Sequence, residues 1–383
     1  MDHAATTYAA PEVVEAMLPY FSEKFGNPSS VYSIGQENKA VIDTTRAKVA
    51  AAINAEPNEI YFTAGGSESD NWVLKGVAFA NLQKGKHIIT TAVEHHAILH
   101  AAEWLQSQGF EVTYLPVDKS GMVSPADVEK AIRPDTILLS VMYANNEIGT
   151  IQPIAEIGAI AQAYGIYFHT DAVQAVGHVP IDVKAENIDM LSLSGHKFYG
   201  PKGVGALYIR RGVRIQNLIH GGAQESRHRA GTENVPGIVG LGAAIERAVR
   251  EMPTESARLT AMRDHLIAEL CKIPASHLNG HPVRRLPNNV NITFEYIEGE
   301  GIVMLLNMFG ICASTGSACN SASLKPSHVL TAIGVPHEIS HGSVRLTLGK
   351  LNTEEDVSYV LEKLPEIVNK LRSMSPLTPD ELR

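Results

Sequence analysis

The chain has 383 residues, 44% of them hydrophobic and 19% charged, a composition typical of a globular protein long enough for two domains. Its 41 acidic residues outnumber 32 basic ones, which gives a formal net charge of -9. Phosphate backbones attract the opposite charge, so we expect no nucleic-acid partner. No signal-like or membrane-spanning apolar stretch is present, so a cytoplasmic protein with no membrane contact is expected.

Helices and short apolar runs alternate over the first two thirds of the chain. After a helix at residues 11–23, strands are predicted at residues 59–63, 87–90, 111–115, 136–143, 166–170, 190–194 and 205–209. The predicted helices between them are residues 67–81, 96–107, 124–132 and 153–164. This alternation predicts an α/β fold with a mainly parallel sheet covered on both faces, and ligands bind such sheets at the carboxyl ends of the strands.

The pattern changes near residue 252. Helices at residues 255–271, at 301–309 and from Thr353 are interspersed with strands at 288–294 and 343–348, and Pro365 is expected to kink the last helix. We therefore expect a large α/β domain over residues 11–251 and a smaller α+β domain formed by residues 1–10 and 252–383.

Lys197 lies where the strand at 190–194 runs into a glycine-rich turn. A lysine that loses its hydration there becomes a nucleophile toward carbonyls and could hold pyridoxal phosphate (PLP) as a Schiff base. A lone lysine at a strand end more often reaches into solvent, so this interpretation depends on partners elsewhere.

Asp171 follows another apolar strand and could pair with the ring nitrogen of PLP, which makes the ring an electron sink. The alternative is a local helix cap. Gln174 and Asn146 could donate to the ring oxygen, although asparagine in such a loop often serves only the turn.

A phosphate cradle is predicted at Gly65, Gly66 and Ser67, between a strand and a helix. The segment has neither the dinucleotide-binding nor the Walker pattern. His95, at the start of the next helix, could stack on a planar cofactor or carry protons. His96 and His100 share a helix face, but a third ligand is not evident, so no metal site is expected.

Cys319 lies in a small, polar stretch that could not pack in a core, which favours a reactive thiol, whereas Cys271 and Cys312 are interpreted as structural. The spacing of the three cysteines predicts neither a disulfide framework nor a zinc ribbon. Arg345 alternates with apolar neighbours and could grip a substrate carboxylate or form a salt bridge between domains.

Together these residues resemble cysteine desulfurases of the NifS/IscS type, within the class V aminotransferase group of fold-type I PLP enzymes. The resemblance extends over essentially the whole chain. It is carried by residues 2–7, 25–30, 65–71, 94–95, 145–147, 169–174, 194–197, 229–232 and 314–319 and by Arg345. It implies a seven-stranded sheet in the large domain, PLP as cofactor and L-cysteine as substrate.

The resemblance also implies roles for individual residues. Lys197 would bind PLP covalently, and Asp171 would pair with its ring nitrogen. Gln174 and Asn146 would contact the ring oxygen, and His95 would stack on the ring. The phosphate would be held by Gly66, Ser67, Ser194 and His196, and by Thr232 from the second subunit of a homodimer. The carboxylate of L-cysteine would be held by Asn27, Asn146 and Arg345.

Cys319 would accept the sulfur as a persulfide and pass it to an iron–sulfur scaffold or another acceptor protein, and it could also act as a transient iron–sulfur ligand. The loop at about 312–328 resembles the mobile loops that deliver sulfur directly. Gly66-Ser67 replaces the more usual Ala-Thr, and Asn320 the usual Thr. A selenocysteine lyase, a PLP aminotransferase and a noncatalytic sulfur-relay protein remain alternatives.

Overall fold

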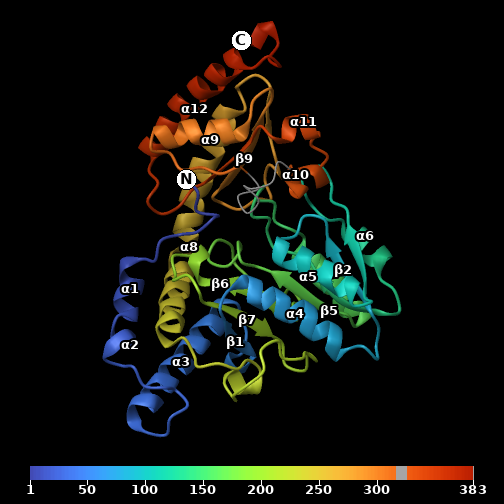
Figure 1. Ribbon diagram of the computed structural model, residues 1–383, viewed down its shortest axis with the longest axis vertical. Coiled ribbons are helices and arrows are strands. Elements are labelled where there is room, and N and C mark those ends of the chain that lie inside the picture. The colour runs from blue at the N-terminus through green and yellow to red at the C-terminus, as the bar shows by residue number, and fades with distance from the viewer. Residues whose placement is uncertain (316–325, 383) are drawn as a thin grey trace.

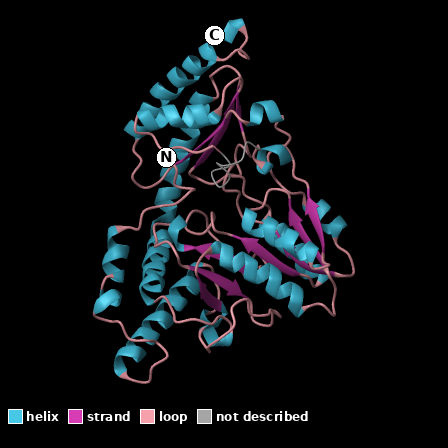
Figure 2. Ribbon diagram, in the orientation of Figure 1, coloured by secondary structure: helices cyan, strands magenta, loops and turns pink. Residues whose placement is uncertain are grey.

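The computed structural model describes residues 1–315 and 326–382, so Cys319 lies outside the described residues. The strands form one sheet of seven and one of three, which occupy the lower and upper parts of Figure 1. Helix α8, Val235–Leu270, runs from the larger sheet toward the smaller one, and Figure 2 shows helices flanking both. Within the described ranges, no helix combines the length and the apolar character needed to cross a lipid bilayer.

The large sheet confirms the predicted α/β fold. Its strands are β1 Ile60–Thr63, β2 His87–Thr91, β3 Glu111–Leu115, β4 Thr136–Ser140, β5 Tyr167–Asp171, β6 Met190–Ser194 and β7 Gly205–Ile209. They follow the order β1-β7-β6-β5-β4-β2-β3. Only β7 runs antiparallel to its neighbours, so the carboxyl ends of the other strands meet at one edge.

Helices cover both faces of this sheet. They are α3 Ser33–Ala52, α4 Gly66–Ala80, α5 His96–Ser107, α6 Pro125–Ala131 and α7 Ile154–Tyr164, with the first half of α8. Alternate residues of a strand belong to different cores, as Ile88 packs with α4 and α5 while Ile89 joins the core on the other side. A strand buried on both faces needs apolar residues at nearly every position, which is why these strands read as continuous apolar runs.

The small sheet has the order β10-β9-β8 and is antiparallel throughout. Its strands are β8 Ser276–Leu278, β9 Asn289–Phe294 and β10 Ser343–Thr347. The helices nearby are α9 Gly299–Met308, α10 His328–Ala332, α11 His337–Ser340 and α12 Glu354–Met374. A separate hydrophobic core joins this sheet to α9, α12 and the second half of α8.

Several predicted boundaries differ from the structure. The helix expected at 11–23 is two helices, α1 Pro11–Met17 and α2 Pro19–Ser22, because Pro19 has no amide hydrogen to continue the first. The 20-residue α3 was not predicted. The expected change near residue 252 falls inside the continuous α8, and the division into residues 11–251 and residues 1–10 with 252–383 stays a prediction.

Candidate active site

A cavity of about 460 Å³ opens at the carboxyl ends of β5 and β6. The predicted site residues that line it are Gly66, Ser67, His95, Asn146, Asp171, Gln174, Ser194, His196, Lys197 and Arg345. Ala4 and Ala5 of the N-terminal segment line it as well. The fold thus brings together, at one sheet edge, residues that are far apart in the sequence, as expected for a mainly parallel sheet.

The N-terminal segment holds the predicted nucleophile inside the cavity. Lys197 Nζ donates hydrogen bonds to the carbonyl oxygens of Ala4 and Ala5, at 2.6 and 2.8 Å. Gln174 Nε2 donates to the same Ala4 oxygen at 3.0 Å. The two backbone carbonyl oxygens thus hold the lysine amine at the wall of the cavity.

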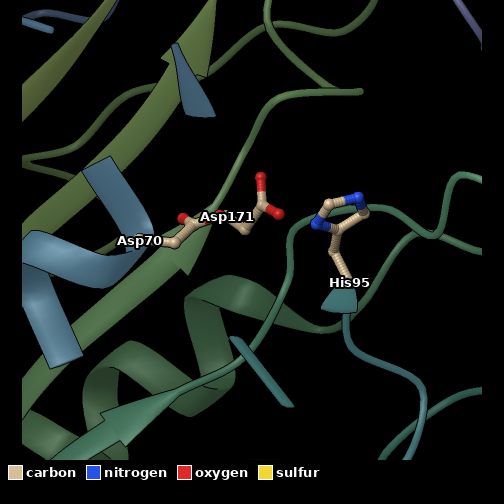
Figure 3. A group of neighbouring side chains, drawn as sticks. All are labelled: Asp70, His95 and Asp171. Carbon is tan, nitrogen blue, oxygen red and sulfur yellow. The ribbon is translucent and has the colours of Figure 1, made fainter. Parts of the chain in front are cut away.

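Asp171 and His95 face one another across the cavity (Figure 3). Asp171 ends β5 and accepts a hydrogen bond from the Val173 amide at 3.0 Å, so it also stabilises the local turn. Burial raises the pKa of Asp171, while His95 and Lys197 act in the opposite direction. This leaves a buried carboxylate that gains from pairing with a cation such as a protonated ring nitrogen.

His95 caps α5 through its side chain. Its Nδ1 accepts the Ala97 amide at 3.1 Å, so the proton of the neutral ring lies on Nε2. Burial lowers the pKa of His95, which keeps the ring neutral near pH 7. A neutral imidazole can stack on a planar ring, and it can accept a proton on the nitrogen that carries no hydrogen.

The other end of the cavity has the features of an anion site. Helix α4 begins at Gly66, after Gly65 at φ +150°, a conformation essentially limited to glycine. An adjoining cavity of about 440 Å³ shares Gly66, Ser67, Ser194 and His196 with the first. The first amides of a helix lack internal acceptors and attract phosphate. Together with the Lys197 amine and the Asp171 carboxylate, which line the same cavity, these residues fit PLP.

Arg345 points into the protein from β10 and is only 2% exposed. Its Nη1 donates to the Asn146 carbonyl oxygen at 3.0 Å, and its Nη2 pairs with Asp2 Oδ1 at 2.9 Å. Its Nε is buried without a hydrogen-bond partner. Arg345 therefore both points inward and forms a salt bridge. Its unused Nε–H donor could bind a substrate carboxylate.

Three buried carboxyl groups of the cavity wall were not predicted: Asp70, Glu94 and Glu147. Burial raises the pKa of Glu94 to about 8 and that of Glu147 to about 7. Buried acidic residues are rare, so sequence reasoning treats them as surface groups. For Glu94 the only available signal was its position directly before His95.

Three predicted residues are not in this cavity. Asn27 is exposed, and its Oδ1 accepts the Ser29 amide at 2.9 Å. Thr232 is exposed and lines a different cavity, of about 200 Å³. Cys319 lies outside the described residues, but both flanks of that segment contact the site: the Ser314 amide donates to the Arg345 carbonyl oxygen at 3.2 Å, and Ser327 Oγ donates to Glu147 Oε2 at 2.5 Å.

Comparison with known proteins agrees with this geometry. The aminotransferase class-V family model matches residues 1–360. Cysteine desulfurase IscS of Methanosarcina thermophila is 68% identical over 383 residues, which cover 100% of this chain and 95% of that protein. Cysteine desulfurase IscS of Clostridium botulinum strain Hall is 61% identical over 386 residues, with 100% and 97% covered.

Two solved structures are also similar. A NifS-like protein superposes with a TM-score of 0.91 at 40% identity, covering 97% of this chain and 99% of that one. SspA in complex with cysteine gives a TM-score of 0.81 at 41% identity, with 91% and 97% covered. These matches confirm both the predicted fold and the resemblance to cysteine desulfurases. The chain belongs to the aminotransferase class-V family.

Proposed function

We propose that this protein is a PLP-dependent cysteine desulfurase, which converts L-cysteine to L-alanine and carries the removed sulfur as a persulfide on Cys319. The observation that carries the proposal is one cavity in which the Lys197 amine, the Asp171 carboxylate and the Arg345 guanidinium converge. The similarity to proteins named cysteine desulfurase and to a cysteine-bound structure identifies the substrate.

When bound, PLP supplies an electron sink that acidifies the Cα hydrogen of the amino acid. Lys197 would attach it covalently, Asp171 would keep its ring nitrogen protonated, and the amides at the start of α4 would bind its phosphate. Gln174 and Asn146 would hold the ring oxygen, and the neutral His95 would lie against the ring. Each of these side chains lines the cavity, which supports the assignment.

The chain's own residues would then move the protons. The free Lys197 amine would accept the Cα proton of the substrate. The neutral His95 ring would take the substrate thiol proton on Nδ1, the nitrogen without a hydrogen, after giving up the Ala97 amide contact, and would become an imidazolium. The Cys319 thiolate attacks the substrate sulfur, the carbon–sulfur bond breaks, and its electron pair stays on carbon, which takes a proton and becomes the methyl group of alanine.

An assay of products tests this proposal. The wild type with L-cysteine should release alanine and, with a reductant, an equal amount of sulfide, whereas Lys197→Ala should release neither. Exchange of amino groups with a 2-oxoacid would indicate an aminotransferase, and activity with selenocysteine alone a selenocysteine lyase. A protein that lacks the yellow colour of bound PLP would instead favour a noncatalytic sulfur relay.

We further propose a homodimer in which Thr232 of one subunit binds the phosphate in the other. Thr232 is exposed and lies outside the main cavity of its own chain, which supports a role in a partner subunit. An exposed apolar surface around α2 also supports a dimer, and it is formed by Leu18, Phe21, Phe25 and Tyr32. Asn27, in the same region, is assigned to substrate binding with the dimer in place.

Mixed dimers test the shared site. Lys197→Ala and Thr232→Ala each weaken every site of their own homodimers. In the mixed dimer both defects fall in one site if Thr232 reaches the partner subunit, and the other site is intact. Recovery of activity on mixing the two variants is expected, and no recovery would place Thr232 in its own subunit's site or in none.

The sulfur acceptor is proposed to be an iron–sulfur scaffold or another carrier protein. The names of the relatives support the first. Transfer of labelled sulfur from the loaded enzyme to a purified scaffold tests it. The cytoplasmic location expected from the sequence is likewise a proposal, which fractionation of the native cells would test.

A further inference from the structure

Asp70 is a buried acid that the mechanism above does not use. It lies on α4, one turn after the start of the helix, and is 1% exposed. Its carboxyl group lies beside that of Asp171, with His95 opposite (Figure 3). One ligand-type atom from each of these three side chains lies within 4.8 Å of the others. Its Oδ1 has no hydrogen-bond partner.

The groups that act most strongly on Asp70 among the described residues are Asp171, Ser192 and Glu94, none of which carries a positive charge. His169 of β5 is nearest, with its Nε2 at 3.7 Å from Asp70 Oδ1. That imidazole is fully buried between Ser140 Oγ and Ser192 Oγ, at 2.9 and 3.0 Å, and burial lowers its pKa to about 3, so it is neutral.

The other titratable groups nearby favour a neutral Asp70 as well. Asp171 and Glu94 are acids, and His95 is neutral near pH 7 because its pKa is lowered. Lys197, which follows β6, acts on Asp171 and is not among the groups that act most strongly on Asp70. Two neighbouring buried carboxyl groups cannot both ionise without a large cost, so one of them retains a proton.

The contacts determine which acid keeps the proton. Asp171 accepts an amide hydrogen bond from Val173 and is influenced by the charge of Lys197, and both favour its ionised form. For Asp70, burial and then the charge of Asp171 raise the pKa well above its usual range, and only Ser192 acts in the other direction. A proton on Asp70 would also give its carboxyl group, which lies within 4.8 Å of Asp171 and His95, a donor of its own.

We propose that Asp70 is a positioning residue for the cofactor: it remains an uncharged acid that donates toward Asp171, so that the pair carries one negative charge, on Asp171. This inference rests on the proposed PLP-dependent function. In this arrangement Asp70 never touches the cofactor. It orients Asp171 and fills the space behind it without competing for the ring nitrogen.

Three variants of the full-length protein test the proposal through PLP affinity, measured by absorbance titration. Asp70→Asn imitates the neutral acid, so its dissociation constant for PLP should stay within about threefold of the wild type. Asp70→Ala removes the donor and should weaken binding at least about tenfold. Equal losses in the two variants would show that the charge is needed, and a wild-type affinity in Asp70→Ala would show that Asp70 has no positioning role. Either result overturns the proposal.

Unfolding measured against pH gives a second readout that does not depend on activity. Because the folded protein holds a proton on Asp70 above the usual aspartate pKa, wild-type stability should fall relative to Asp70→Asn as pH rises, by up to about tenfold in the unfolding constant per pH unit. Glu186→Gln, at a carboxyl outside the cavity whose pKa burial also raises, should change the unfolding profile but not PLP binding.

The two readouts separate the possible failures. If the ratio of the unfolding constants of Asp70→Asn and wild type does not change with pH, Asp70 is ionised. That result would overturn the inference. Wild-type protein that binds no PLP would instead refute the proposed function, and the unfolding comparison would still decide the charge of Asp70.

Discussion

Replacing Arg345 tests how the substrate is held. The guanidinium is 2% exposed, it uses two of its nitrogens on Asn146 and Asp2, and its Nε is unpaired. A buried hydrogen bond to a charged group contributes about 1.5–3 kcal/mol. At 1.36 kcal/mol for each factor of ten, Arg345→Gln should raise KM for L-cysteine by about 10-fold to 150-fold.

The assay is alanine formation as a function of L-cysteine concentration, with bound PLP measured separately. Because the carboxylate does not react, kcat should change much less than KM. Asp2→Asn is the matched control: it removes the salt-bridge partner at 2.9 Å but keeps the guanidinium, so KM should stay the same or fall. An unchanged KM in Arg345→Gln, or an equal rise in Asp2→Asn, would refute the assigned role and favour a purely structural salt bridge.

Two further predictions concern the cavity wall. Gly65→Ala forces a side chain into φ +150°, which costs about 1–3 kcal/mol, so PLP should dissociate faster without a change of fold; unchanged retention of PLP during gel filtration would contradict this. Glu94 has a folded-state pKa of about 8, raised by burial from 4.5, so its ionisation destabilises the folded protein as pH rises through that window. Glu94→Gln should therefore gain stability relative to wild type with rising pH, by at most about 5 kcal/mol above pH 8, and parallel urea-unfolding profiles would contradict it.

The sequence predicted the large sheet well because most of its strands are buried on both faces. Runs such as Met190–Ser194 therefore stand out from the helices around them. Helix α3 was missed because its buried face mixes Gly35, Asn38 and Thr45 with the apolar Ile42 and Val49. The periodic signal that predicts amphipathic helices is weak in such a segment.

The start of α8 was also predicted too late. The sequence predicts a helix only from residue 255, whereas α8 begins at Val235 and continues through Pro253 to Leu270. Proline removes one hydrogen bond, and packing of this helix against α1 and α3 on one side and the small sheet on the other compensates for that loss.

The predicted site residues were those whose chemistry is visible in the residue type, such as Lys197 and Asp171. The buried acids Asp70 and Glu94 were not predicted, because their raised pKa values arise only from burial and from the charges of neighbouring acids. Nor does sequence pattern alone reveal that the N-terminal carbonyls of Ala4 and Ala5 hold the Lys197 amine. That contact joins residues more than 190 positions apart.

The most direct measurement follows the sulfur atom itself. The PLP-loaded protein is given sulfur-labelled L-cysteine without reductant or acceptor, and its peptides are mapped by mass spectrometry while alanine is quantified. The labelled atom should appear as a persulfide on Cys319, in an amount matching the alanine formed. Label on Cys271 or Cys312 instead, or alanine without any protein-bound label, would contradict the account.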